Sequence, residues 1–180
     1  MKKTICTALA VLTVSLCLVS CNNKQAEQGK KLVSSDNGGY TFEVPQEWEI
    51  SRTDGMVAVY NPDDATKVNV TAYKFDNGEN EIISSADYWQ IYKTTFEDTF
   101  TQMNVNKVEE TNISGIPAQH VSYNVSLGQD SFDCQTVLAV YSTDVYVLTL
   151  TQGAKTQENE KVYVDYTQAF KEMIQSFRIG

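Results

Sequence analysis

The sequence is poor in histidine and cysteine, with one histidine and four cysteines among 180 residues. Transition-metal sites need clustered histidine and cysteine side chains, so this composition argues against them. Cys6, Cys17 and Cys21 lie in or at the end of an N-terminal apolar run, which leaves only Cys134 in the rest of the chain. One thiol allows no internal disulfide there, and we expect Cys134 to be a small buried hydrophobic residue without a redox role.

The residues for common covalent mechanisms are also scarce. A Ser-His-Asp or Cys-His mechanism would have to use His120, which falls on the polar face of a predicted strand. The sequence has no nucleophile-elbow motif and no glycine-rich loop that could hold a phosphate. We therefore predict no enzyme activity and no cofactor, and we expect His120 to be an ordinary strand histidine satisfied by solvent or a neighbour.

Positive charge is scarce, since 14 lysines and arginines stand against 23 acidic residues and the net charge is −9. This balance argues against nucleic acid as a partner. Acidic side chains gather at Asp63-Asp64 and in residues 76–81, and calcium binds such oxygens, but neither stretch has the ligand spacing of an EF-hand loop. We predict solvated turns and no metal site, while calcium binding by these loops stays open.

The N-terminus has the pattern of an export signal. Lys2 and Lys3 precede an apolar run from Ile5 to Val19, and Leu18-Val19-Ser20-Cys21 resembles the bacterial lipoprotein box. The resemblance implies cleavage of residues 1–20 and lipidation of Cys21. An ordinary cleaved signal or a transmembrane helix are the alternatives, but the run is short for a span of about 20 residues. Removal of Lys2 and Lys3 would shift the net charge from −9 to −11.

The predicted lipidation sets the expected location. Two or three acyl chains, such as palmitate, would hold the protein on a membrane, because each buried methylene contributes about 0.8 kcal/mol. Residues 21–31 comprise the lipidated cysteine and a polar stretch that we expect to be a flexible tether. Residues 32–180 form the predicted domain. We expect it on the extracytoplasmic face of the cell membrane or outer membrane, with the oligomeric state open.

Three consecutive strand patterns from Ala118 to Thr151 form the expected centre of the fold. Val121, Tyr123, Val125 and Leu127 alternate with polar residues, and Phe132 to Val140 becomes apolar on both faces. Val145 to Thr151 follows a short turn. Such short connections indicate a β-meander, with the middle pattern inside a sheet.

Other elements flank this meander. Strands are predicted at 40–44, 56–60 and 67–74, with a charged edge strand at 105–111. A helix begins at Ser84, with Asp87 in a capping-box-like position, and its aromatic stripe runs from Trp89 to Met103 as core packing. A last helix spans roughly Glu158 to Phe177, with Thr156 as a possible cap. The pattern predicts an α+β fold, a mostly antiparallel sheet of about six strands with helices packed on it.

Several collinear segments resemble the PsbP-like group. They are Gly39 to Trp48, Tyr60-Asn61-Pro62, Ile113 to Ala118 with Tyr123, Tyr146 to Thr149, and the terminal Ile174-Gln175-Ser176-Phe177. The resemblance implies a PsbP/Mog1/DcrB-type α-β-α sandwich. Relatives include photosystem subunits, a binder of a small GTPase, chaperone-like adaptors and many bacterial lipoproteins, and nearly all act by binding proteins. The matching residues support the fold, so no binding residue is carried over.

Two hypotheses for the function follow. The first is a lipid-anchored adaptor that docks to an envelope protein or complex and performs no catalysis. The second is a ligand-capture lipoprotein that binds a peptide, lipid or glycan in a cleft beside the sheet or the Trp89 helix. A sheet face with exposed aromatic residues favours the second, whereas a sheet fully covered by helices favours the first.

Overall fold

The computed structural model describes residues 29–36, 39–53, 56–63, 69–76, 83–97, 100–157 and 159–180. In these ranges the chain forms two helices and two antiparallel sheets, with strand orders β3-β4-β5-β9-β8-β7-β6 and β1-β2-β10. The elements in chain order are β1 (Lys30–Ser34), β2 (Tyr40–Pro45), β3 (Glu49–Thr53), β4 (Met56–Tyr60), β5 (Asn69–Asp76), α1 (Ser85–Glu97), β6 (Gln102–Ile113), β7 (Ile116–Leu127), β8 (Asp130–Tyr141), β9 (Asp144–Gly153), α2 (Thr167–Ser176) and β10 (Arg178–Ile179).

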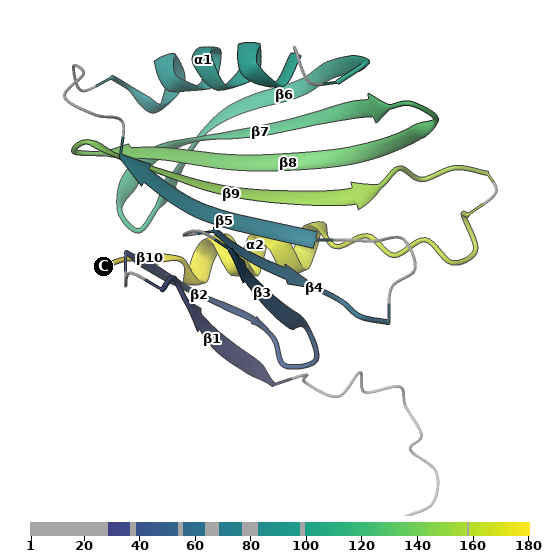
Figure 1. The fold of residues 1–180 in the computed structure, drawn as a ribbon, viewed down its shortest axis with the longest axis horizontal. Coiled ribbons are helices and arrows are strands. Elements are labelled where there is room, and N and C mark those ends of the chain that lie inside the picture. The colour runs from purple at the N-terminus through teal and green to yellow at the C-terminus, as the bar shows by residue number, and fades with distance from the viewer. Residues whose placement is uncertain are drawn as a thin grey trace, which may run out of the picture.

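The seven-stranded sheet separates two cores. Helix α1 lies over one face of this sheet, and α2 with the three-stranded sheet lies against the other (Figure 1). Trp89 of α1 packs with Tyr123 and Val147 on the first face. Phe170 of α2 packs with Leu148 on the second face, in a core that also contains Phe42 of the small sheet. The predicted α+β class is therefore confirmed as a layered arrangement of helices around a mostly antiparallel sheet.

The predicted meander is present as β7, β8 and β9. Tight turns join the three strands, and each one pairs antiparallel with the next. Val137, Leu138 and Ala139 of β8 are all fully buried, because both faces of the sheet are covered at this point. The prediction that β8 lies inside the sheet is confirmed. The predicted edge strand at 105–111 is also confirmed, since β6 ends the seven-stranded sheet.

The number of strands differs from the expectation. The described ranges contain ten strands. Seven of them correspond to patterns recognised in the sequence, β1, β3 and β10 are additional, and the expected total of about six is too low. Strand β10 has only two residues, and it forms because Arg178 and Ile179 lie beside Thr41 and Tyr40. Such a pairing depends on a segment more than 130 residues away in sequence, so no local alternation marks it.

Helix α1 starts as predicted but ends earlier. The Ser84 hydroxyl accepts the backbone N–H of Asp87 at 3.1 Å and donates to the Asp87 carboxylate at 2.7 Å. The apolar spacing predicts a stripe that continues to Met103, whereas the helix ends at Glu97. Met103 pairs with Val125 in the β6–β7 ladder instead, and still packs against the core under α1. Phe100 and Met103 thus pack against the same core as Trp89 and Tyr92, although they lie beyond the end of the helix.

Helix α2 is shorter than predicted, because side chains bind the backbone of residues 154–167. The Asn159 amide donates to the Ala154 carbonyl, and its oxygen accepts the Thr156 N–H at 2.8 Å. The Asp165 carboxylate accepts the Thr167 N–H at 2.9 Å, just where the helix begins. These bonds compete with helix formation, so Thr156 caps a turn and the prediction of a helix from Glu158 is wrong.

Candidate functional site

Three positions or stretches singled out in the sequence fall outside the described residues. They are Cys21, the predicted lipidation site, Asp64, and residues 77–81 of the acidic loop. Within the part of the chain that the structure describes, no three His, Cys, Asp or Glu side chains are grouped to hold a metal ion. In the same part, neither helix is long and apolar enough to cross a membrane.

His120 and Cys134, the two residues a Cys-His mechanism would need, lie on opposite faces of the sheet. The His120 ring packs beside Phe170 of α2, and its Nε2 lies 3.1 Å from the Gln135 amide oxygen. Cys134 belongs to the core under α1. Successive strand residues point to opposite faces, so the sheet itself separates the thiol from the imidazole. His120 is satisfied by a neighbour, as predicted.

Cys134 is a buried residue of the α1 face. Burial raises the pKa of its thiol from 9.0 to about 11, against a weaker lowering by the Thr151 hydroxyl at 4.0 Å from its Sγ. A thiol with a raised pKa carries little thiolate at neutral pH, and the thiolate is the reactive form. The prediction of a small buried cysteine is therefore confirmed.

A cleft of ≈ 250 Å³ lies on the α1 face of the seven-stranded sheet. Tyr92 of α1 and Phe100 just beyond it form one side, and the sheet forms the rest. None of the described side chains that line the cleft is acidic or basic. Besides Tyr92 and Phe100, the lining residues come from four strands: Asn69, Thr71 and Tyr73 of β5; Tyr123 and Val125 of β7; Phe132 and Cys134 of β8; and Thr149 and Thr151 of β9. This is the position at which the sequence left a ligand cleft open as an alternative.

The floor of this cleft is a block of four polar side chains on two adjacent strands. Asn69 pairs with Thr151, and Thr71 pairs with Thr149, in the β5–β9 ladder. Residues two apart on a strand share a face, so the four groups lie together on the α1 face. Thr149 is buried, while Asn69, Thr71 and Thr151 are partly exposed. The floor therefore presents one amide and three hydroxyls to the cleft.

Hydroxyl groups continue from the cleft into the core as a hydrogen-bonded chain. Tyr73 donates to the Tyr92 hydroxyl at 3.0 Å, and Tyr92 is hydrogen-bonded to Thr149. The Thr136 hydroxyl continues the chain, because it is hydrogen-bonded to the Thr149 hydroxyl at 2.9 Å and to the Tyr123 hydroxyl at 3.0 Å. Burial raises the pKa of Tyr73, Tyr92 and Tyr123 well above the usual tyrosine value. These hydroxyls are therefore neutral, and the described part of the cleft lining carries no charge.

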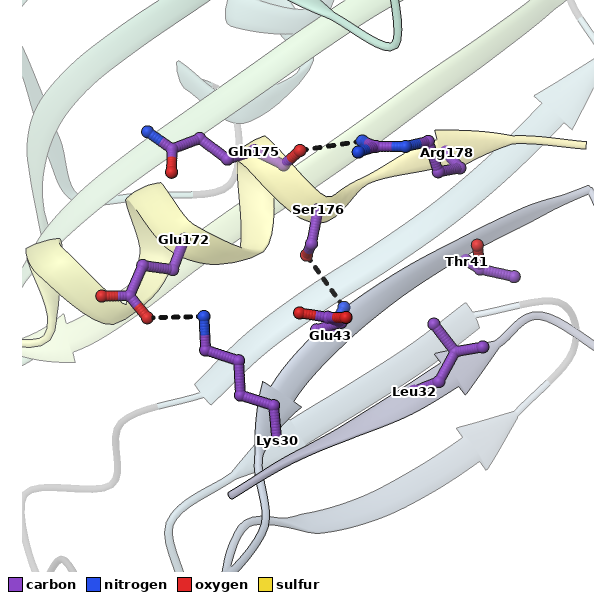
Figure 2. Close-up of a pocket in the computed structure, with 8 residues that line it drawn as sticks. All are labelled: Lys30, Leu32, Thr41, Glu43, Glu172, Gln175, Ser176 and Arg178. Atoms are coloured by element: carbon purple, nitrogen blue, oxygen red, sulfur yellow. Dashed lines mark hydrogen bonds and ion pairs between the residues drawn. The ribbon is translucent and has the colours of Figure 1, made fainter. Parts of the chain in front are cut away.

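A second hollow of ≈ 390 Å³ lies between the three-stranded sheet and α2 (Figure 2). Lys30 reaches across it to Glu172, with Nζ and Oε2 2.9 Å apart, and the Ser176 hydroxyl accepts the Glu43 N–H at 2.9 Å. About two fifths of each side chain in the ion pair is exposed. Water screens such a pair, so it contributes about 1 kcal/mol or less. The polar groups of this hollow bind one another, so we assign the hollow no ligand.

A third hollow of ≈ 320 Å³ lies beside the start of α2 and has a polar lining. Its amides are already committed within the chain. Gln135 donates to the Thr167 hydroxyl at 2.9 Å, and Gln152 donates to the Tyr163 hydroxyl at 3.0 Å and accepts the Tyr166 N–H at 3.1 Å. These bonds fix the segment that leads into α2, which gives the hollow a structural explanation.

The fold corresponds to a known family. The family model described as PsbP matches residues 28–179. Since this match spans most of the chain, the protein belongs to the PsbP family, and the resemblance seen in the sequence is confirmed. No curated protein matches the chain in a sequence comparison.

Solved structures share the fold at low sequence identity. Cyanobacterial PsbP (CyanoP) from Synechocystis sp. PCC 6803 aligns with a TM-score of 0.63 at 14% identity, over 91% of this chain and 99% of that one. The Ran-binding protein Mog1p of Saccharomyces cerevisiae gives 0.61 at 11% identity, over 84% and 96%. LpqN of Mycobacterium tuberculosis, involved in cell envelope biogenesis, gives 0.52 at 15%, over 84% and 90%. At these identities the likeness shows the fold alone.

Sequence reasoning did not find the residues of the cleft. It assigned the aromatic stripe of the Trp89 helix to packing, which is right for Trp89, whereas Tyr92 and Phe100 also border the cleft. A signal was present in β9, where Thr149 and Thr151 alternate with buried leucines in an otherwise apolar strand. Hydroxyls at every second position of a central strand indicate a polar row on one face.

Proposed function

We propose that this protein is a lipid-anchored, non-catalytic adaptor that docks to another protein on the extracytoplasmic face of a bacterial membrane. The observation that carries the proposal is the order of segments: a lipoprotein-box-like sequence at 18–21, a polar stretch, and a PsbP family domain matched over 28–179. The Ran-binding protein Mog1p shares the fold, as does LpqN, involved in cell envelope biogenesis. The first supports a role in protein binding, and the second supports an envelope setting.

The separation of His120 from Cys134 by the sheet supports the non-catalytic part of the proposal. His120 bonds Gln135 on one face, and Cys134 is buried with its pKa raised on the other. A His120→Ala variant is therefore expected to keep any host phenotype that the protein confers. Loss of that phenotype in a variant with unchanged abundance would instead support a reaction that uses the imidazole.

The anchor and the partner can be tested together in intact host cells. Metabolic labelling with palmitate is expected to mark the wild type and not the Cys21→Ser variant. Cross-linking followed by affinity purification and mass spectrometry is expected to recover a reproducible envelope partner that the unanchored variant loses. Equal labelling of both forms would contradict lipidation at Cys21, and recovery of no partner under conditions that capture known neighbours would contradict the adaptor role.

The cleft on the α1 face, whose described lining is uncharged, favours ligand capture as a second candidate function. Partly exposed aromatic side chains, Tyr73, Phe100 and Phe132, border a sheet face that α1 leaves partly uncovered. A concave, mostly apolar site with a few convergent polar groups is typical of small-molecule binding. Native mass spectrometry of the purified mature chain tests this function directly. A co-purifying molecule that Thr151→Phe displaces would support capture, whereas a chain that carries no added mass in any preparation would count against it.

A further inference from the structure

The charge of the cleft restricts what it can hold. The described residues that line it include no acidic or basic side chain. Burial keeps the Tyr92 and Tyr123 hydroxyls and the Cys134 thiol protonated, so none of them supplies a charge at neutral pH. An ion that enters loses its hydration and meets no counter-charge, and burial of an unpaired charge is strongly unfavourable. The occupant is therefore uncharged.

The cleft lining has an apolar part and a polar part. Phe100, Val125 and Phe132 contribute hydrocarbon to the lining. Asn69 and Thr71 lie on the polar floor, and neither side chain forms a hydrogen bond with any other described residue. A polar group that loses water without gaining a partner costs free energy. A ligand that covers this floor must therefore bring its own hydrogen-bonding group, while its remaining surface must be apolar.

The size of the cleft limits the ligand further. The volume is ≈ 250 Å³. An apolar cavity of about 150 Å³ holds one benzene molecule. A site somewhat larger than that, and open on one side, accepts a body of one or two rings or a short aliphatic segment.

We propose that this cleft is a binding site for a small, uncharged, amphipathic molecule, with an apolar body against Phe100, Val125 and Phe132 and a hydroxyl, carbonyl or amine group over Asn69 and Thr71. The proposal rests on the ligand-capture candidate and adds the chemistry of the ligand to it.

Two dyes that differ in one charged group test the chemistry. 1-Naphthylamine has two rings, carries one amino group and is uncharged at neutral pH, and 8-aminonaphthalene-1-sulfonate is the same framework with a sulfonate. The chain from residue 21 onward carries Cys21→Ser in this assay, so that no acyl chain is present to compete. Fluorescence titration is expected to show saturable binding of the uncharged dye, at least tenfold tighter than binding of the sulfonate. Equal affinity for both dyes, or tighter binding of the sulfonate, overturns the proposal.

Substitutions locate the bound dye. Thr151→Phe places a ring in the cleft and is expected to weaken binding of the uncharged dye at least tenfold. Thr94→Phe makes the same change on the exposed side of α1 and is expected to change the affinity less than twofold. If Thr151→Phe does not fold, as judged by circular dichroism, Thr71→Phe fills the same floor from β5 and takes its place. A folded cleft variant that binds the dye like the wild type overturns the assignment of the site.

The failure of this inference can be told apart from failure of ligand capture. A co-purifying molecule that Thr151→Phe displaces, in a protein that binds the sulfonate as well as the uncharged dye, leaves capture standing and overturns the proposed chemistry. A protein that carries no co-purifying molecule and binds neither dye overturns both.

Discussion

Thr136 holds the middle of the buried hydroxyl chain, and its replacement by valine tests how much that chain contributes to stability. Valine keeps the shape of threonine and removes the oxygen that bridges Tyr123 and Thr149. Thr149 retains its bond to Tyr92, but the Tyr123 hydroxyl, 2% exposed, loses its partner. A buried hydroxyl without a partner costs about 1–3 kcal/mol, so we expect Thr136→Val to lose about 2 kcal/mol of unfolding free energy.

The assay is urea unfolding, followed by tryptophan fluorescence. Trp48 lies in the α2 core and Trp89 in the α1 core, so single-tryptophan backgrounds show whether both cores unfold together. For a chain of this size, about 2 kcal/mol corresponds to a fall of about 4–8 °C in the melting temperature. Thr53→Val at an exposed strand position is the matched control, and should change stability by less than about 0.5 kcal/mol.

A double variant separates the hydrogen bonds from the rest of the substitution. Tyr123→Phe combined with Thr136→Val removes both ends of one bond, so no tyrosine hydroxyl is left without a partner. We expect the double variant to lose less stability than the sum of the two single variants, with a coupling of about 1 kcal/mol. Additive losses, or a Thr136→Val protein as stable as the wild type, would refute the reasoning that this chain is a coupled buried network.

Three further predictions concern the cores and the cap. Phe170→Ala removes a fully buried ring from α2 and should cost about 3–5 kcal/mol in urea unfolding, against little change for exposed Lys171→Ala; a loss below about 1 kcal/mol would contradict the packing. Ser84→Ala removes the α1 cap and should cost about 1 kcal/mol with faster amide exchange in the first turn of α1; unchanged exchange would count against the cap. Between pH 9 and 11 the unfolded chain loses the Cys134 proton and the folded chain keeps it, so stability relative to Cys134→Ala should fall by about 2–3 kcal/mol as pH rises; parallel pH profiles would disprove this.

Local patterns predicted the elements whose contacts are local. The tight turns of the β7–β9 meander pair neighbours in sequence. The alternation of apolar and polar residues correctly placed Val121, Tyr123 and Val125 on one buried face, whereas Leu127 at the end of β7 is exposed. The start of α1 was also predictable, because Ser84 caps the backbone only three residues ahead. In both cases the residues that decide the structure lie next to one another.

Two elements that were predicted incompletely depend on distant partners. Strand β10 exists because Arg178 meets Thr41, whereas β1 was missed although it pairs with the next strand, β2. Helix α2 was predicted too long, because nothing in the apolar spacing showed that Gln152 of β9 would accept the Tyr166 N–H. A local bond also contributes, since the Asp165 carboxylate accepts the Thr167 N–H at the start of the helix.

The sequence by itself determined the side of the sheet on which each meander residue lies, because alternation is a property of the extended backbone. It also predicted an export signal with Cys21 as the lipidated residue, and its composition argued against a catalytic pair. Only the tertiary structure decided which parts of each face are covered. Thr149 and Thr151 have the same local pattern whether a helix covers them or not, and they border a cleft because α1 and Phe100 leave that part of the sheet partly exposed. Which side chains of a sheet face are covered depends on elements far along the chain. The candidate site therefore follows from how the helix packs on the sheet and not from a sequence motif.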